Sequence, residues 1–238
     1  MRTQEDAERI RELVDANHIL AHQGVLDGFG HVSVRCASDA TRFWIARSMA
    51  PALVGADDVV QCDLEGTVHD AQGRRSYVER FIHAAIYAAR PNVQAVVHSH
   101  SPALIPFGVT GARLRPVCHM SGFLGSTTPV FEMRHATPEA TDMLVRNLAL
   151  GRALATSLGD ASVALMRGHG SVTVGASIKQ AVFRAIQAEA NAKLQLASMP
   201  LGEITYLSDD EARLAAAAND EHLDRPWALW LRELRNAG

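Results

Sequence analysis

The irregular order of strand-like and helix-like segments is the feature that most constrains the fold of this chain. Three short apolar or alternating stretches follow one another before residue 63, and later strands are separated by helical stretches of unequal length. A strict alternation of strands and helices would predict a parallel sheet, because parallel strands need crossover connections. The chain lacks that rhythm. We therefore expect an α/β fold, a three-layer α/β/α sandwich with a mixed, mainly antiparallel central sheet.

Local patterns predict where the individual elements lie. Strands are expected at residues 31–36, 42–46, 58–62, 94–100, 162–168 and 171–175. Helices are expected at residues 4–23, 77–90, 137–158, 208–218 and 226–235, and after the cap residues Ser101 and Ser177. Ser101-Pro102 and Thr137-Pro138 each place a proline directly after a capping side chain, which favours a helix start. Because no repeat or linker interrupts the sequence, we expect residues 1–238 to form one domain.

The composition excludes several classes of protein. The 238 residues are 47% hydrophobic, and 23 basic against 26 acidic residues give a net charge of -3. This balance disfavours a nucleic-acid-binding surface and a disordered chain. No apolar run reaches the roughly 18 residues of a membrane span, and the charged N-terminus does not resemble a secretory signal. The three cysteines form no CxxC pair, which fits a reduced compartment. We therefore expect a cytoplasmic protein without nucleic-acid or membrane partners.

Two histidines stand where a buried strand ends. His98 and His100 follow two valines, and side chains two residues apart on a strand point to the same face. Imidazoles arranged in this way can converge on one cation, and neutral imidazole suits zinc, manganese, iron or cobalt. The alternative is a pair of hydrogen-bonded histidines at the end of a sheet.

A third histidine lies between two β-like stretches. His169 is flanked by Gly168 and Gly170, which allow a tight turn that presents the imidazole. Three histidines from two β segments would make an open three-ligand site with room for water or substrate. An ordinary turn histidine is the alternative.

An acidic residue completes the candidate site. Glu79 precedes His98 by 19 residues and lies at the expected start of a helix, where the helix dipole stabilises a carboxylate. It could be a fourth ligand, an acid or base, or an ordinary first-turn glutamate. His83 shares a helix face with Glu79 and forms a rival pair, but this pair lacks the third partner of an HExxH site.

Taken together, these motifs resemble the class II aldolase/adducin family, of the zinc-dependent fuculose-phosphate aldolase type. The resemblance spans residues 17–175 and rests on GHVSVR (30–35), Glu79, HSH (98–100) and GHG (168–170). It implies an α/β/α fold and one divalent metal per subunit, zinc, manganese or cobalt. It also implies a homotetramer. The implied metal ligands are His98, His100 and His169, with Glu79 as a fourth ligand or as the acid/base.

The chain departs from the sugar-phosphate aldolases of that family in the segments that bind phosphate. His31 stands where those enzymes carry an asparagine, residues 46–49 lack a glycine, and Tyr77-Val78 replace a serine pair. A phosphate cradle needs small residues and free backbone N–H groups. A phosphorylated sugar is therefore not the expected substrate.

A carboxylate is the anion that the remaining residues suit. Arg47 can bind a carboxylate through two hydrogen bonds, and His31 and Ser48 can add donors. We assign Arg47, Ser48 and Tyr77 to substrate binding and Glu79 and His31 to catalysis. A surface salt bridge is the alternative role of Arg47.

The expected function follows from the decarboxylase branch of the family, which GHVSVR and MRGHG also resemble. That branch acts on hydroxylated pyridine dicarboxylates, dihydroxyphthalate and related acids of aromatic degradation. The expected activity is metal-dependent decarboxylation of a hydroxylated aromatic or pyridine dicarboxylic acid. The cation acts as a Lewis acid that spreads the charge of an enolate or carbanion. Glu79 or His31 would supply the proton, and Arg47 would hold the second carboxylate.

Three alternatives remain open. The first is an aldolase that cleaves a non-phosphorylated hydroxy-keto acid and releases an aldehyde in place of CO₂. The second is a non-catalytic interaction module like the adducin head. The third is a metal-binding hydrolase, although the chain has no GxSxG nucleophile motif.

Overall fold

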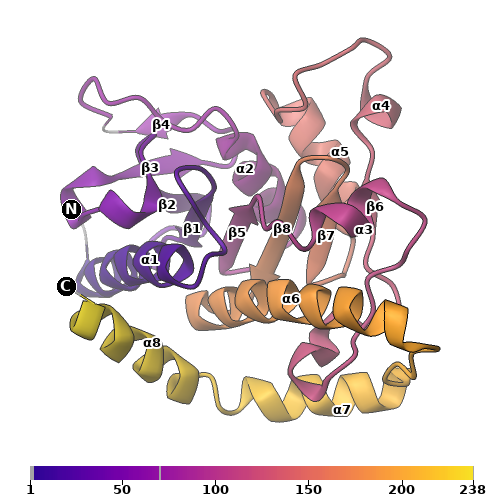
Figure 1. The fold of residues 1–238 in the computed structure, drawn as a ribbon. Coiled ribbons are helices and arrows are strands. Elements are labelled where there is room, and N and C mark those ends of the chain that lie inside the picture. Colours follow the sequence, from indigo (N-terminus) through magenta and orange to yellow (C-terminus); the bar gives the residue numbers. More distant parts are fainter. Residues whose placement is uncertain (1–2, 70, 238) are drawn as a thin grey trace.

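One mixed sheet forms the centre of the molecule in a computed structural model that describes residues 3–69 and 71–237 (Figure 1). The strand order is β4-β3-β2-β1-β5-β8-β7-β6, and every neighbouring pair is antiparallel except β6 and β7. The strands are β1 (His31–Arg35), β2 (Arg42–Ala46), β3 (Val59–Asp63), β4 (Val68–His69), β5 (Ala95–Ser99), β6 (Val130–Phe131), β7 (Val163–Met166) and β8 (Gly170–Gly175). The expected mixed, mainly antiparallel sheet is confirmed.

Helices cover both faces of this sheet, as the three-layer prediction required (Figure 1). The α-helices are α1 (Gln4–His22), α2 (Arg80–Ala89), α3 (Ile105–Val109), α4 (Met133–Ala136), α5 (Leu148–Leu158), α6 (Ile178–Ser198), α7 (Asp209–Asp220) and α8 (Asp224–Ala237). Short 3₁₀ helices occupy Pro51–Leu53, Ala56–Asp58, His119–Leu124 and Met199–Leu201. In the described part of the chain, no helix is long and apolar enough to cross a membrane.

Alternation along the central strands decides which side chains meet which helices. Val97 of β5 packs in the core with α1, α6 and α8, whereas Val96 packs in the core with α2 and α5. Since side chains alternate along a strand, His98 lies on the face of Val96, toward α2. The same holds on β1, where Val32 faces α1 and Ser33 contacts α2. The face toward α2 therefore carries the polar side chains from which the site is built.

The expected helix start at Ser101-Pro102 is wrong by several residues. Residues 102–104 form a turn, and α3 begins only at Ile105. The Ser101 hydroxyl does not cap a helix but contacts the Ser99 hydroxyl in the interior. The Ala103 N–H donates to Glu189 on α6. Contacts to the rest of the fold thus replace the local capping interaction.

The expected helix over residues 137–158 is wrong in its first half. Helix α5 starts at Leu148, with Asn147 as its cap, and residues 137–147 have no regular structure. In this irregular segment the N–H of Val145 donates to Glu79, 66 residues away in sequence. A helix there would use that N–H internally, so the hydrogen bond to Glu79 and the helix exclude each other.

Candidate metal centre and active-site pocket

The β7–β8 hairpin brings the third histidine beside the end of β5. His169 lies in the turn between these strands, and β8 pairs with β5 so that Val172 is opposite His98. Gly168 has a φ of 64°, a conformation that glycine adopts without strain. At Gly170 a Cβ atom would overlap the Ser99 carbonyl oxygen, so only glycine permits this close approach. The two glycines around His169 therefore serve both the turn and its packing on β5.

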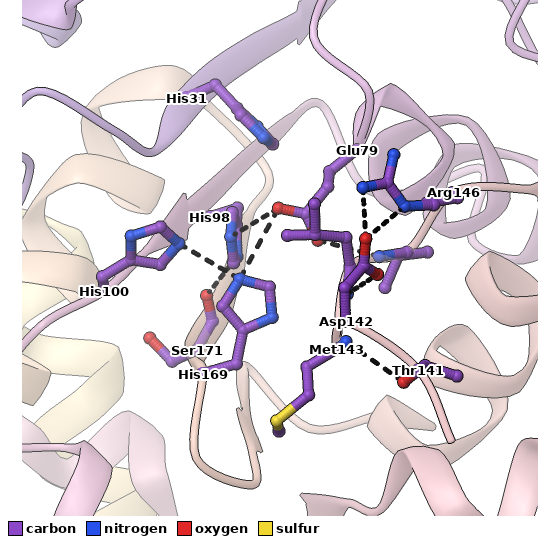
Figure 2. A network of polar contacts seen from close by, with 12 residues as sticks. His31, Glu79, His98, His100, Thr141, Asp142, Met143, Arg146, His169 and Ser171 are labelled. Carbon is purple, nitrogen blue, oxygen red and sulfur yellow. Dashed lines mark hydrogen bonds and ion pairs between the residues drawn. The ribbon is translucent and has the colours of Figure 1, made fainter. Parts of the chain in front are cut away.

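Three imidazoles and one carboxylate converge at this point (Figure 2). One ligand atom from each of Glu79, His98, His100 and His169 lies within 4.8 Å of all the others. The Nε2 atoms of His169 and His100 are 3.1 Å apart. Oε2 of Glu79 is 3.6 Å from His98 Nε2 and 3.5 Å from His169 Nε2. The structure thus brings together the three histidines that the sequence proposed as metal ligands and Glu79, proposed as a fourth ligand or the acid/base.

These distances fit a metal site better than a hydrogen-bonded cluster. Ligand atoms about 2.0–2.1 Å from a tetrahedral ion lie roughly 3.3 Å from one another, close to the separations found here. The Nδ1 atom of His98 is 3.1 Å from the Ser171 carbonyl oxygen and donates to it. That bond fixes the tautomer and leaves a lone pair on Nε2, which is buried without a hydrogen-bond partner. A divalent cation among the four groups would satisfy this lone pair.

Burial keeps the imidazoles ready to bind a cation. It is the main cause that lowers the pKa of His169 to about 4, and it also lowers the pKa of His100. Neutral imidazole is the form that binds metals. At neutral pH these two rings therefore offer their lone pairs without first losing a proton.

Glu79 is held in a single orientation. It lies just before α2 and is 7% exposed, and its Oε1 accepts the Val145 N–H at 2.9 Å. Burial by itself would raise the pKa of Glu79, but the polar groups around its carboxylate, the Val145 N–H among them, outweigh burial and lower the pKa to about 2. The carboxylate is therefore ionised at neutral pH, with Oε2 directed at the histidines.

The segment that holds Glu79 is a part of the candidate site that sequence reasoning missed. Met143 adopts a φ of 67°, which is strained for a residue with a side chain, and its Cε lies beside Gly168. The Thr141 hydroxyl accepts the Met143 N–H, and Asp142 pairs with Arg146 (Figure 2). Residues 141–146 thus form a bracket, hereafter the 141–146 bracket, that contacts both Glu79 and the turn of His169. No local pattern predicts it.

A cavity of about 290 Å³ opens beside the cluster. Its polar lining includes His31, Ser48, Tyr77, Glu79 and His100. Its apolar lining is formed by Phe29, Met49, Ala50, Val78 and Leu144. This volume is at the small end of the range for ligand pockets, and the predominance of apolar walls is typical of them. Four of the five residues that the sequence assigned to substrate binding or catalysis therefore line this cavity, and Arg47 is the exception.

His31 lies deep in this pocket. It is 3% exposed, pairs across the sheet with His98, and its ring centroid is 5.0 Å from that of His98 and 4.6 Å from that of Tyr77. The Tyr77 hydroxyl donates to the Met49 carbonyl, so this side chain packs as a wall. The pocket thus has an imidazole at its base beside the candidate ligands.

Arg47 does not reach the pocket. Its Nε lies 2.7 Å from Asp58 Oδ1, and its side chain is 38% exposed. The interaction with Asp58 corresponds to the salt-bridge alternative that the sequence left open. No lysine or arginine is among the described residues that line the cavity.

The comparison with known families agrees with this geometry. Residues 11–196 match the family model described as the class II aldolase and adducin N-terminal domain. The chain belongs to this family. Class II aldolases use a divalent metal, and the cluster of three histidines and Glu79 is the group of described residues that could bind one.

Among curated proteins, the family members with similar sequences include decarboxylases. The chain is 38% identical to decarboxylase tropJ of Talaromyces stipitatus, over 96% of this chain and 95% of the relative. It is 30% identical to 3,4-dihydroxyphthalate decarboxylase of Arthrobacter keyseri, over 76% of this chain and 75% of that protein. These relatives support a lyase of the decarboxylase branch of the family.

Solved structures of the family share the fold. L-fuculose 1-phosphate aldolase from Glaciozyma antarctica PI12 superposes with a TM-score of 0.80, covering 98% of this chain and 90% of that chain. The sequence identity is 24%, so the similarity establishes the class II aldolase fold and not the substrate.

Proposed function

We propose that this family member is a divalent-metal-dependent decarboxylase of a hydroxylated aromatic or pyridine dicarboxylic acid. One observation carries the proposal: three imidazoles and a carboxylate converge at the edge of a small cavity whose other walls are mainly apolar. A flat ring fits against such walls, while its polar edge meets the cluster. The names of the decarboxylase relatives support the same chemistry.

The residues divide the work between binding a cation and shaping the substrate site. His98, His100 and His169 would hold the ion, and Glu79 would be a fourth ligand or the acid/base. A bound divalent cation would supply Lewis-acid stabilisation of the negative charge that develops when the carbon–carbon bond breaks. His31 lies close enough to the cluster to contact a substrate bound there.

The apolar walls would favour loss of the carboxylate that contacts them. A carboxylate loses its charge when it leaves as CO₂, so an apolar surface destabilises the bound acid more than the transition state. Met49, Val78 and Leu144 form such a surface in this pocket. In our proposal a second carboxylate would be bound by Arg47 only after that side chain leaves Asp58.

Product analysis tests the proposal most directly. Chelator-treated protein, alone and with added Mn²⁺, Co²⁺ or Zn²⁺, would be incubated with a panel of hydroxylated aromatic and pyridine mono- and dicarboxylic acids. We expect CO₂ release that depends on the added metal and is absent in His98→Ala. Full activity in metal-free protein would refute the metal requirement, and an aldehyde product would indicate an aldolase. Light scattering on the same samples would test the homotetramer that the family resemblance implies.

A further inference from the structure

A continuous row of buried polar side chains runs from the pocket into the core. Nδ1 of His31 is 2.6 Å from Nε2 of His83, and Nδ1 of His83 is 2.6 Å from the Ser33 hydroxyl. The Ser33 hydroxyl is in turn 2.8 Å from the Tyr87 hydroxyl. None of the four side chains is more than 3% exposed. The row has one end at the pocket and one end in the core.

The two elements that supply the row explain why it is continuous. His31 and Ser33 are two apart on β1 and therefore share the face toward α2. His83 and Tyr87 are four apart on α2 and therefore share the helix face toward β1. The strand and the helix alternate their contributions, so each group meets its neighbour from the other element.

Burial keeps the inner members of the row uncharged. It lowers the pKa of His83 to about 3 and raises the pKa of Tyr87. His83 therefore carries one proton, and Tyr87 keeps its phenolic proton. The 2.6 Å contact between His83 Nε2 and His31 Nδ1 holds one proton between the two nitrogens. The Arg35 guanidinium stacks on the Tyr87 ring and donates to backbone carbonyls, so it adds no acceptor to the row.

The buried end of the row fixes the direction of every hydrogen bond. In the described part of the chain, the Tyr87 hydroxyl has Ser33 as its one hydrogen-bond partner, so it satisfies its proton only by donating to Ser33. The Ser33 proton must then go to His83 Nδ1, and the His83 proton to His31 Nδ1. The opposite direction leaves a buried hydroxyl proton without an acceptor, which disfavours it by roughly tenfold to a hundredfold.

We propose that Ser33 and His83 are positioning residues that hold His31 as the tautomer protonated on Nε2. His31 then presents an N–H donor to the pocket, and not a lone pair. It would bind an acceptor oxygen of the substrate, such as a carboxylate or a ring oxygen, a role that rests on the function proposed above. The tautomer itself does not depend on that function.

The same rule separates His31 from the candidate ligands. His98 donates its Nδ1 proton to the carbonyl of Ser171 and so directs an Nε2 lone pair at the cluster. His31 accepts at Nδ1, so its Nε2 carries the proton and directs it toward the pocket. Two histidines that pair across β1 and β5 thus have opposite tautomers, and His31 is excluded from the ligand set although its ring is 5.0 Å from that of His98.

Solid-state ¹⁵N spectroscopy of histidine-labelled, zinc-loaded protein reads the tautomers directly. A difference spectrum against His31→Gln assigns the two nitrogens of His31. We expect a protonated Nε2 and an unprotonated Nδ1 in the wild type. A protonated Nδ1 would overturn the proposal, and this measurement needs no variant of the row to fold.

Two variants of the row test its direction. Ser33→Ala removes the hydroxyl that donates to His83, so we expect His31 to become a mixture of both tautomers. Tyr87→Phe is the matched control: Ser33 still has His83 as its acceptor, so the Nε2 tautomer should persist. An unchanged spectrum in Ser33→Ala, with the circular dichroism of the wild type, would show that the row does not set the tautomer.

Metal content and kinetics separate this proposal from the function. His31→Leu should keep one zinc per chain, whereas His100→Ala should lose it; loss of zinc from His31→Leu would make His31 a ligand and overturn the inference. On an active substrate, His31→Leu should raise KM at least tenfold, and an unchanged KM would contradict the donor role. If no acid releases CO₂, the proposed function fails while the tautomer result stands.

Discussion

Two buried carboxylates of this protein have the same charge and opposite surroundings. Asp6 of α1 and Glu79 before α2 are 1% and 7% exposed. Both have a pKa below the ordinary value, although burial by itself raises it in each case. The difference lies in which groups approach their oxygens.

Both oxygens of Asp6 are saturated by neutral donors. Oδ1 accepts the N–H of Ala37 at 2.9 Å and the indole N–H of Trp44 at 3.1 Å. Oδ2 accepts the hydroxyls of Thr3 and Ser38. These donors come from the start of α1, the segment after β1, and β2, so the carboxylate ties the helix to the sheet.

Only one oxygen of Glu79 is satisfied in this way. Oε1 accepts from Val145, while Oε2 faces two imidazole nitrogens at 3.5 and 3.6 Å. At least one of these nitrogens, His98 Nε2, points a lone pair at the carboxylate. An arrangement of lone pairs without protons between them is unfavourable unless a cation lies among them. A buried carboxylate whose two oxygens both accept hydrogen bonds therefore has a structural role, whereas one with an unsatisfied oxygen is a candidate metal ligand.

Exchange of each carboxylate for its amide should produce the largest contrast in activity. Glu79→Gln should lower kcat by about a hundredfold or more, because it removes a fourth ligand or an acid/base. It should keep more metal than His98→Ala, since the three histidines remain. Asp6→Asn should have the activity of the wild type per folded molecule at 25 °C. Steady-state rates with elemental analysis would test this, and a wild-type rate in Glu79→Gln would reduce Glu79 to a structural residue.

The same two variants should rank in the opposite order when stability is measured: Asp6→Asn should lose more than Glu79→Gln. Asp6→Asn places amide hydrogens against donors and should lower the free energy of unfolding by about 2–4 kcal/mol. For a chain of this size that corresponds to a fall in Tm of roughly 4–16 °C. Glu79→Gln should lower the Tm of the metal-free protein by less. Thermal unfolding of both variants in the presence of a chelator would measure this difference. Equal losses in Tm would contradict the assignment of a structural role to Asp6 alone.

A substitution in the 141–146 bracket should have a smaller and more selective effect, which is on metal affinity. Val145→Pro removes the N–H that orients Glu79, and loss of such a supporting contact typically weakens metal affinity by about 10- to 100-fold. Val145→Ala keeps the N–H and loses only apolar contacts, so it is the matched control. Metal titration with a competing chelator should separate the two variants. Equal affinities would mean that the bracket does not orient the carboxylate.

The sequence predicted those parts of the molecule that depend on local pattern. Alternation and glycine placement located β1, β5 and β8, and the spacing of Glu79, His98 and His169 suggested the cluster that the structure brings together. The order of the elements also predicted the mixed sheet. Each of these features is expressed within a few neighbouring residues.

The remaining parts depend on contacts between distant segments. The bond from Val145 to Glu79 replaces the helix that Thr137-Pro138 locally favours, and no periodicity records such a bond. The role of Asp58 as partner of Arg47 arises only when β2 and β3 pair. Contacts between different segments thus decided both where the local prediction failed and why Arg47 does not line the pocket.

The pH dependence of stability gives the finest test of the two carboxylates. The pKa of Asp6 is lower in the folded protein than its usual 3.8, although burial opposes this, because Ser38, Trp44, Ala37 and Thr3 all donate to it. Its stabilisation is therefore complete above pH 4 and is lost as the pH falls through the folded pKa. The difference in free energy of unfolding between wild type and Asp6→Asn should shrink from pH 5 to pH 2.5. Glu79 is present in both proteins, so its contribution to the pH dependence cancels in this difference. A difference that stays constant with pH would mean that the ionised form of Asp6 does not stabilise the fold.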